Sequence, residues 1–142
     1  MATTQFSIGR DCQLVLIGPS GRVDISFVTG FESSQVTQPI RVDRLDGVQM
    51  ATELPKGWEG SFDVERGSSA VDDFIAAAEL AYRTSGSLPY GMIYQYITEA
   101  DGSLSTYQYD GVVFRLANSG VWRGDAAVKQ KLLFFASSRT RL

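Results

Sequence analysis

The sequence predicts a mainly β (α+β) fold, a β-barrel or sandwich with one flanking α-helix. Alternating apolar and polar residues recur along most of the chain, separated by turn-forming pairs such as Asp46-Gly47 and Asp101-Gly102. One stretch, residues 69–86, instead has apolar residues at the helical spacing of three to four. With 142 residues and 44% hydrophobic content, the chain is expected to form a single domain over residues 1–142 with a sizeable core.

The N-terminal part predicts two strands, residues 12–17 and 22–28, joined by the turn-forming sequence GPSG. The second run alternates apolar and polar residues, which indicates one buried face and one wet face. Cys12 is the only cysteine, so no intrachain disulfide can form. We expect it to be a buried small hydrophobe rather than a reactive thiol.

Residues 31–57 predict a projecting hairpin or loop. The sequences RVDRL and VQMAT flank Asp46-Gly47, a strong short-range hairpin signal. Both faces of this hairpin are expected to be polar. A long projecting connection usually has a function in a compact domain, and the alternative is a mobile surface loop.

Residues 58–66 predict a strand with an apolar face and an acidic face. Trp58, Phe62 and Val64 alternate with acidic residues, and Ser61 shares the acidic side. The alternation places four side chains on the wet face, namely Glu59, Ser61, Asp63 and Glu65. We expect the apolar face to be buried under the helix that follows. An alternative interpretation of the acidic face is that Lys129 and Lys131 sit beside these acids as cross-strand pairs, which would make the patch structural.

That helix is expected to begin after Ser69, with Asp72 reaching back to Ser69 in a capping box, and to end at Gly86. Its apolar stripe, expected to lie flat on a sheet, consists of Val71, Phe74, Ile75, Ala78 and Tyr82. Further strands are predicted at residues 92–98, 104–109, 112–117 and 126–136, and Asp110-Gly111 predicts either a tight turn or a bulge.

The composition disfavours an enzyme. Histidine is absent, which removes the commonest general base and the commonest metal ligand. Glu59, Asp63 and Glu65 could hold a hard cation, but no calcium-loop or phosphate-loop motif is present. We therefore expect no catalytic residues, no metal and no cofactor.

Charge is unevenly distributed along the chain, although the net charge is only −3. Residues 59–79 are acidic and residues 123–142 are basic. These two stretches are either solvated surface or complementary faces of neighbouring subunits. The aromatic run YGMIYQYI lacks interleaved basic residues, so it favours a core or subunit interface over base stacking.

The order of these features resembles the tail tube proteins of contractile-tailed bacteriophages, which are relatives in fold of the type VI secretion tube protein. The resemblance covers nearly the whole chain. It is carried by four stretches: FSIGRDCQLVLIGPSGRVDISFVTGFE, IRVDRLDGVQM, KGWEGSFDVERGSSAVDDFI and DAAVKQKLLFFASSRTRL.

This resemblance implies a structural virion protein that forms homohexameric rings, with the sheet continued between subunits into a barrel around a channel. Stacked rings would form the inner tail tube for viral DNA ejection, with tail sheath and baseplate proteins as partners. DNA would pass through without specific binding, along a channel lined by Glu59, Ser61, Asp63 and Glu65. The residues expected to contact the adjacent ring are Arg41, Asp43, Arg44, Asp46 and Gln49.

Other interpretations remain open at the level of sequence. A baseplate tube-initiator or tail-completion protein of the same fold would have a similar sequence pattern, and a small-ligand-binding β-barrel is a more distant alternative. The N-terminus has no signal-peptide pattern and no apolar run is long enough to span a membrane. The expected location is the virion, after assembly in the host cytoplasm.

Overall fold

The computed structural model describes residues 12–18, 21–23, 28–67, 69–87 and 89–142. The elements are, in chain order, β1 (Cys12–Gly18), β2 (Gly21–Val23), β3 (Val28–Asp43), β4 (Gln49–Glu65), α1 (Ala70–Ser85), β5 (Gly91–Thr98), β6 (Leu104–Asn118), β7 (Lys129–Ala136) and β8 (Ser138–Arg141). Residues 6–11 of the first stretch that carries the resemblance, and the expected strand residues 24–27, lie outside the described residues. The predicted β-rich fold with one flanking helix is confirmed.

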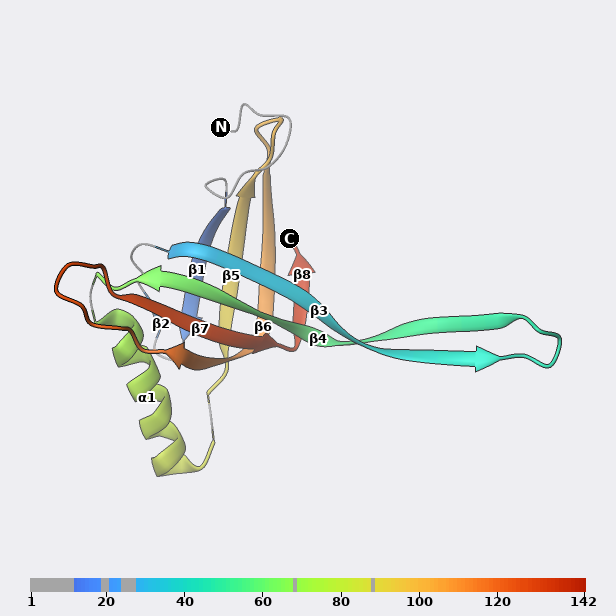
Figure 1. The fold of residues 1–142 in the computed structure, drawn as a ribbon, viewed down its shortest axis with the longest axis horizontal. Helices are drawn as coiled ribbons and strands as arrows, with labels where there is room; N and C mark the ends of the chain where they lie inside the picture. Colours follow the sequence, from blue (N-terminus) through green and yellow to red (C-terminus); the bar gives the residue numbers. More distant parts are fainter. Residues whose placement is uncertain (1–11, 19–20, 24–27, 68, 88) are drawn as a thin grey trace.

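The strands form two layers that share β6. The hydrogen-bonded order is β2-β1-β5-β6-β7-β4-β3, and β8 also pairs with β6. We call β3, β4, β7 and residues 113–118 of β6 the hairpin sheet, and β1, β2, β5, β8 and residues 104–112 of β6 the terminal sheet. In Figure 1, β1, β5 and β6 run across the direction of β3, β4 and β7, an orthogonal packing with the core between the layers.

The strand β6 passes from one sheet to the other at Gly111. The Asp110-Gly111 pair is therefore a bend within one long strand rather than a tight turn, and the two predicted strands 104–109 and 112–117 are one element. Gly111 has a φ of +61°, which side chains rarely adopt, and an added Cβ would lie 2.5 Å from the Ser137 hydroxyl. Gly111 thus permits the bend that joins the two sheets.

The core is aromatic and lies between the two sheets. The ring of Phe134 stacks on Phe31 at 5.7 Å and meets the edge of Tyr109 at 5.6 Å. Phe62, on the apolar face of β4, is fully buried and contacts Phe114 of β6. The predicted apolar face of residues 58–66 is confirmed, but the opposite sheet covers it. The helix covers this face only in part, through Val71 and Ile75, because the terminal sheet supplies a whole second layer.

A polar chain crosses this core and links the sheets. The Tyr109 hydroxyl lies 2.9 Å from the Ser33 hydroxyl of β3 and 3.4 Å from Gln95 Oε1 of β5. Gln95 Nε2 in turn donates to the sulfur of Cys12 at 3.4 Å. The thiol is half-buried, and its contact with an amide differs from the purely apolar setting expected for it.

The helix α1 closes one end of the sandwich with its first half only. Val71 is buried in the core, and the Phe74 ring meets the edge of Phe114 at 5.2 Å. Figure 1 shows the rest of the helix extending away from the strands, and Tyr82 is 54% exposed. The stripe therefore does not lie flat along its length on its own sheet, since the sheet ends before the helix does.

The structure confirms the predicted C-terminal end of α1 but not the predicted capping at its N-terminal end. Gly86 has a left-handed φ of 75° and its N–H donates to the Tyr82 carbonyl at 2.7 Å, which confirms the predicted helix end. The capping box was wrong. Ser69 makes no side-chain capping bond, and its hydroxyl donates to Asp73 Oδ2 at 3.0 Å. Asp72, the expected partner, accepts hydrogen bonds from Arg66 and Gln130 instead.

The strands β3 and β4 form one long hairpin that leaves the sandwich (Figure 1). Their register runs from Val28↔Val64 to Asp43↔Gln49, with an irregularity between Val36 and Thr37. Asp46-Gly47 lies in the turn, where Gly47 has a φ of +86° and its N–H donates to the Arg44 carbonyl at 3.0 Å. The predicted strand 58–66 is therefore the inner part of an arm that continues outward without a break.

Candidate assembly surface

The outer face of the hairpin sheet, which points away from the core, carries the four residues expected to line a channel. Glu59 is exposed, Asp63 and Glu65 are half-buried, and Ser61 is only 5% exposed. The hydroxyl of Ser61 donates to Glu32 Oε1 of β3 at 3.1 Å, so Glu32 covers it. The structure thus places all four on one face, as the alternation predicts, but Ser61 offers little surface to an open channel.

Basic residues of β7 lie directly opposite two of these acids. Lys131 is the cross-strand partner of Asp63, and Lys129 is that of Glu65. Side chains at directly opposite positions of an antiparallel pair share a face, and opposite charges there contribute about 0.2–1 kcal/mol. The acidic and basic stretches of the sequence therefore meet within one subunit, at neighbouring strands.

The outer face is consequently close to neutral rather than acidic. The strand registers place four acids on it (Glu32, Glu59, Asp63 and Glu65) with three bases (Arg115, Lys129 and Lys131). Two apolar side chains of β7, Leu133 and Phe135, lie among them. The alternative that Lys129 and Lys131 sit beside the acids as cross-strand pairs is confirmed, and these two bases with Arg115 offset most of the acidic charge on the outer face.

The part of the hairpin beyond the sandwich has two unlike faces. Cross-strand pairing places Val42 opposite Met50 and Ile40 opposite Thr52 on one face. Val42 is 53% exposed and Met50 is 56% exposed, so this apolar face is uncovered within one subunit. The expectation that both faces are polar was wrong.

The other face of the hairpin, with its turn, carries the residues expected to contact an adjacent ring. Arg41 and Asp43 lie on this face, and Gln49 is the partner of Asp43. In the turn, Arg44 Nη2 forms an ion pair with Asp46 Oδ2 at 2.9 Å, which leaves these two charges partly neutralised. The structure thus brings the five residues together at the outer end of one projecting element.

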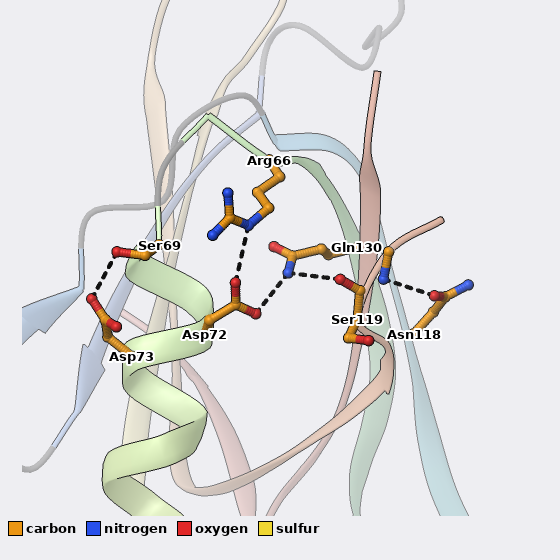
Figure 2. Close-up of polar contacts among 8 residues, drawn as sticks. Arg66, Ser69, Asp72, Asp73, Asn118, Ser119 and Gln130 are labelled. Atoms are coloured by element: carbon orange, nitrogen blue, oxygen red, sulfur yellow. Dashed lines mark hydrogen bonds and ion pairs between the residues drawn. The ribbon is translucent and has the colours of Figure 1, made fainter. Parts of the chain in front are cut away.

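A polar network that sequence reasoning missed fixes the start of α1 to the end of β4 and the start of β7 (Figure 2). Asp72 Oδ2 accepts from Arg66 Nε at 3.0 Å, and Asp72 Oδ1 accepts from Gln130 Nε2 at 2.9 Å. Gln130 Nε2 also donates to the carbonyl of Ser119 at 3.1 Å, and Gln130 is only 1% exposed. The sequence contains a pattern that could have indicated this network. Gln130 falls in phase with the buried Leu132 of β7, and a polar residue on a buried face needs hydrogen-bond partners.

Arg139 is a second functional candidate that sequence reasoning did not place. The guanidinium carbon of Arg139, on β8, lies 3.8 Å from the ring centroid of Tyr107 and 4.8 Å from that of Trp58. Stacking of this kind stabilises a partly desolvated guanidinium by about 1–2 kcal/mol. The basic C-terminal stretch is therefore part of the fold at this position rather than only solvated charge.

Chemistry-bearing clusters are few in the part of the chain that the structure describes. No group of three or more Cys, Asp or Glu side chains is arranged to hold a metal ion there. Over the same residues, no helix is both long and apolar enough to cross a membrane. The features that stand out are surfaces: the outer face, the free sheet edges and the projecting hairpin.

Comparison with known proteins gives a consistent result at the level of fold. No protein-family profile and no curated protein matches this chain by sequence. A chain of the sheath–tube complex of PVC, an extracellular contractile injection system in its extended state, aligns with a TM-score of 0.65 and 13% identity, covering 99% of this chain and 94% of that chain. The chain has the contractile tail tube fold.

Two further structures with this fold come from the ends of such assemblies. The PVC sheath/tube terminator in its extended state aligns with a TM-score of 0.63 and 13% identity, covering 92% of this chain and 93% of that chain. The tube-terminating cap of the anti-feeding prophage aligns with a TM-score of 0.63 and 12% identity, covering 100% of this chain and 94% of that chain. The tube fold is therefore present in tube and terminator contexts alike.

Proposed function

We propose that this chain is a structural subunit of a tail tube, without enzymatic activity or cofactor, that assembles with copies of itself into rings which stack into a conduit. The observation that carries this proposal is the open hairpin sheet of a contractile-tube fold. The strand order ends at β3 without closing on itself, and the hairpin extends far from its own core. An uncovered sheet edge and an uncovered apolar hairpin face both favour burial against other subunits.

The proposed ring is a homohexamer in which the hairpin sheets of neighbouring subunits join around a central channel. The second half of the α1 stripe, with Ala78 and the exposed Tyr82, then packs on the next subunit, because it reaches beyond its own sheet. Rings stack through the hairpin, which carries Arg41, Asp43, Arg44, Asp46 and Gln49 toward the adjacent ring. The sheath and baseplate are the other partners of such a tube.

The proposed lumen surface is the outer face, on which Glu59 is exposed and Asp63 and Glu65 are half-buried. We propose a phage tail as the particle and viral DNA as the cargo, which passes through without specific binding. A face on which acids and lysines alternate neither holds phosphates strongly nor repels them strongly, and this suits passage. The corresponding location is the virion, after assembly in the host cytoplasm.

A second candidate function, a tube terminator or initiator, is favoured by the likeness to a terminator and a tube-terminating cap. Such a protein forms one ring and does not extend into a tube by itself. The projecting hairpin favours the tube subunit, because it offers a second contact along the direction of growth in every copy.

Sedimentation velocity of the purified chain over a wide concentration range tests the proposal. A tube subunit shows a hexamer-sized species and a heavier polydisperse fraction that grows with concentration. A terminator or initiator stops at the single ring. A monomer at every concentration contradicts both functions.

A further inference from the structure

Within the part of the chain that the structure describes, the hairpin sheet has two unpaired edges on opposite sides. Its strand order is β6 (residues 113–118), β7, β4 and β3, and every neighbouring pair is antiparallel. Among the described residues, β3 pairs only with β4, and residues 113–118 of β6 pair only with β7. Each edge therefore presents free backbone donors and acceptors.

The even number of strands fixes how two copies can join. The strands β3 and β6 are the first and fourth of an alternating set, so they run in opposite directions. A rotation about the axis of the ring places a second copy beside the first and keeps the direction of its strands along that axis. The strand β6 of the second copy then lies next to β3 of the first and runs antiparallel to it. The joint then has the same pairing as every other pair in the sheet.

The two edges also carry opposite charges on the same face. Glu32 is the single charged residue in residues 28–36 of β3, and Arg115 is the single charged residue in residues 113–118 of β6. Both are exposed and lie on the outer face. They also lie at the two ends of one cross-strand row, Glu32↔Ser61↔Leu133↔Arg115.

We infer that β3 of one subunit pairs antiparallel with residues 113–118 of β6 in the next copy, and that Glu32 of the first lies beside Arg115 of the second on the outer face. This inference rests on the proposed ring. When the row continues across the seam, the two side chains are direct or diagonal neighbours, and a stagger of two residues still leaves them within reach of each other. The pair selects the partner edge and excludes slips of one residue, because such a slip moves one of the two charges to the core face.

Charge reversal tests this seam. Glu32→Arg and Arg115→Glu each place like charges side by side at every joint of the ring, and the double variant restores opposite charges in the reverse order. Each single variant is expected to raise the concentration of half-maximal ring formation by about tenfold or more, since like charges replace opposite ones at each seam. The double variant is expected to return to within about threefold of the wild type.

Two controls separate assembly from folding. Glu32→Gln keeps an acceptor for the Ser61 hydroxyl and removes the charge, so it distinguishes loss of that bond from loss of the seam pair. Glu99→Arg reverses a charge in the turn between β5 and β6 of the terminal sheet, away from both edges and from α1, and is expected to assemble as the wild type does. Circular dichroism of each variant establishes that the subunit is folded.

The outcomes distinguish this inference from the proposed function. The seam is supported when the wild type forms rings, both single variants assemble poorly and the double variant recovers assembly. The seam is overturned, and the tube function is left standing, when the wild type forms rings and both single variants assemble normally. The same holds when the double variant assembles no better than the single variants. A wild type that forms no rings at any concentration overturns both.

Discussion

Substitution of Asp72 by alanine should destabilise the subunit much more than substitution of its neighbour Asp73. Both carboxylates lie in the first turn of α1, so both lose about 0.3–1 kcal/mol of favourable interaction with the helix dipole. Asp73 loses in addition only its exposed bond from Ser69. Asp72 loses the bonds from Arg66 and Gln130 (Figure 2).

The magnitude follows from the burial of the two donors. Gln130 is 1% exposed and keeps only the Ser119 carbonyl as a partner for its amide, so the stranded donor costs about 1–3 kcal/mol. The Arg66 side chain is 26% exposed and its guanidinium also lies 5.2 Å from the ring centroid of Trp122, which it keeps in the variant, so loss of the ion pair costs at most about 1 kcal/mol. We expect Asp72→Ala to cost about 2–4 kcal/mol and Asp73→Ala to cost about 1 kcal/mol or less.

Urea unfolding of the monomeric subunit measures both values, below the concentration at which rings form. Asp72→Asn refines the result, because the amide oxygen can still accept from Gln130 while the charge opposite Arg66 is lost. Its cost should lie between those of the two alanine variants. Equal destabilisation by Asp72→Ala and Asp73→Ala would show that the network contributes nothing beyond the helix dipole, and would refute the reasoning.

The remaining predictions concern assembly and transport. Replacing residues 41–50 by a short Gly/Ser link should leave folded subunits, since this part of the hairpin contributes nothing to the core. The variant should form no elongated tubes in electron micrographs. Tubes of normal length would show that the hairpin has another role. Changing Glu59, Asp63 and Glu65 together to lysine should permit assembly. The tube should then retain DNA, because its lumen would carry a strong positive charge. Unchanged infectivity of virions with this triple variant would contradict the assignment of these residues to the lumen.

The sequence predicted local features well wherever a single segment determines them. The alternation of residues 58–66 correctly separated Phe62 and Val64 from the acids. Gly86 ended the helix as expected, and Asp46-Gly47 lies in the hairpin turn. Each of these depends on residues a few positions apart, whose preference no distant contact overrides.

Features that depend on pairing between distant segments could not be read in this way. The apolar hairpin face is an exception, because Ile40 and Val42 alternate with charged residues in the sequence and so indicate it locally; the register adds Met50 opposite Val42. The capping box failed because Gln130, 58 residues away, binds Asp72. The sequence left open whether Lys129 and Lys131 lie beside the acids of residues 58–66, and only the register of β4 with β7, a strand far along the chain, decides that they do.

The most direct test of the central claim is negative-stain electron microscopy of the purified chain, concentrated and imaged without any other protein. The account predicts end-on views of six-fold rings with a central channel, and side views of stacked rings whose length grows with concentration. Separate compact particles of single-subunit size at every concentration, with no rings, would contradict it.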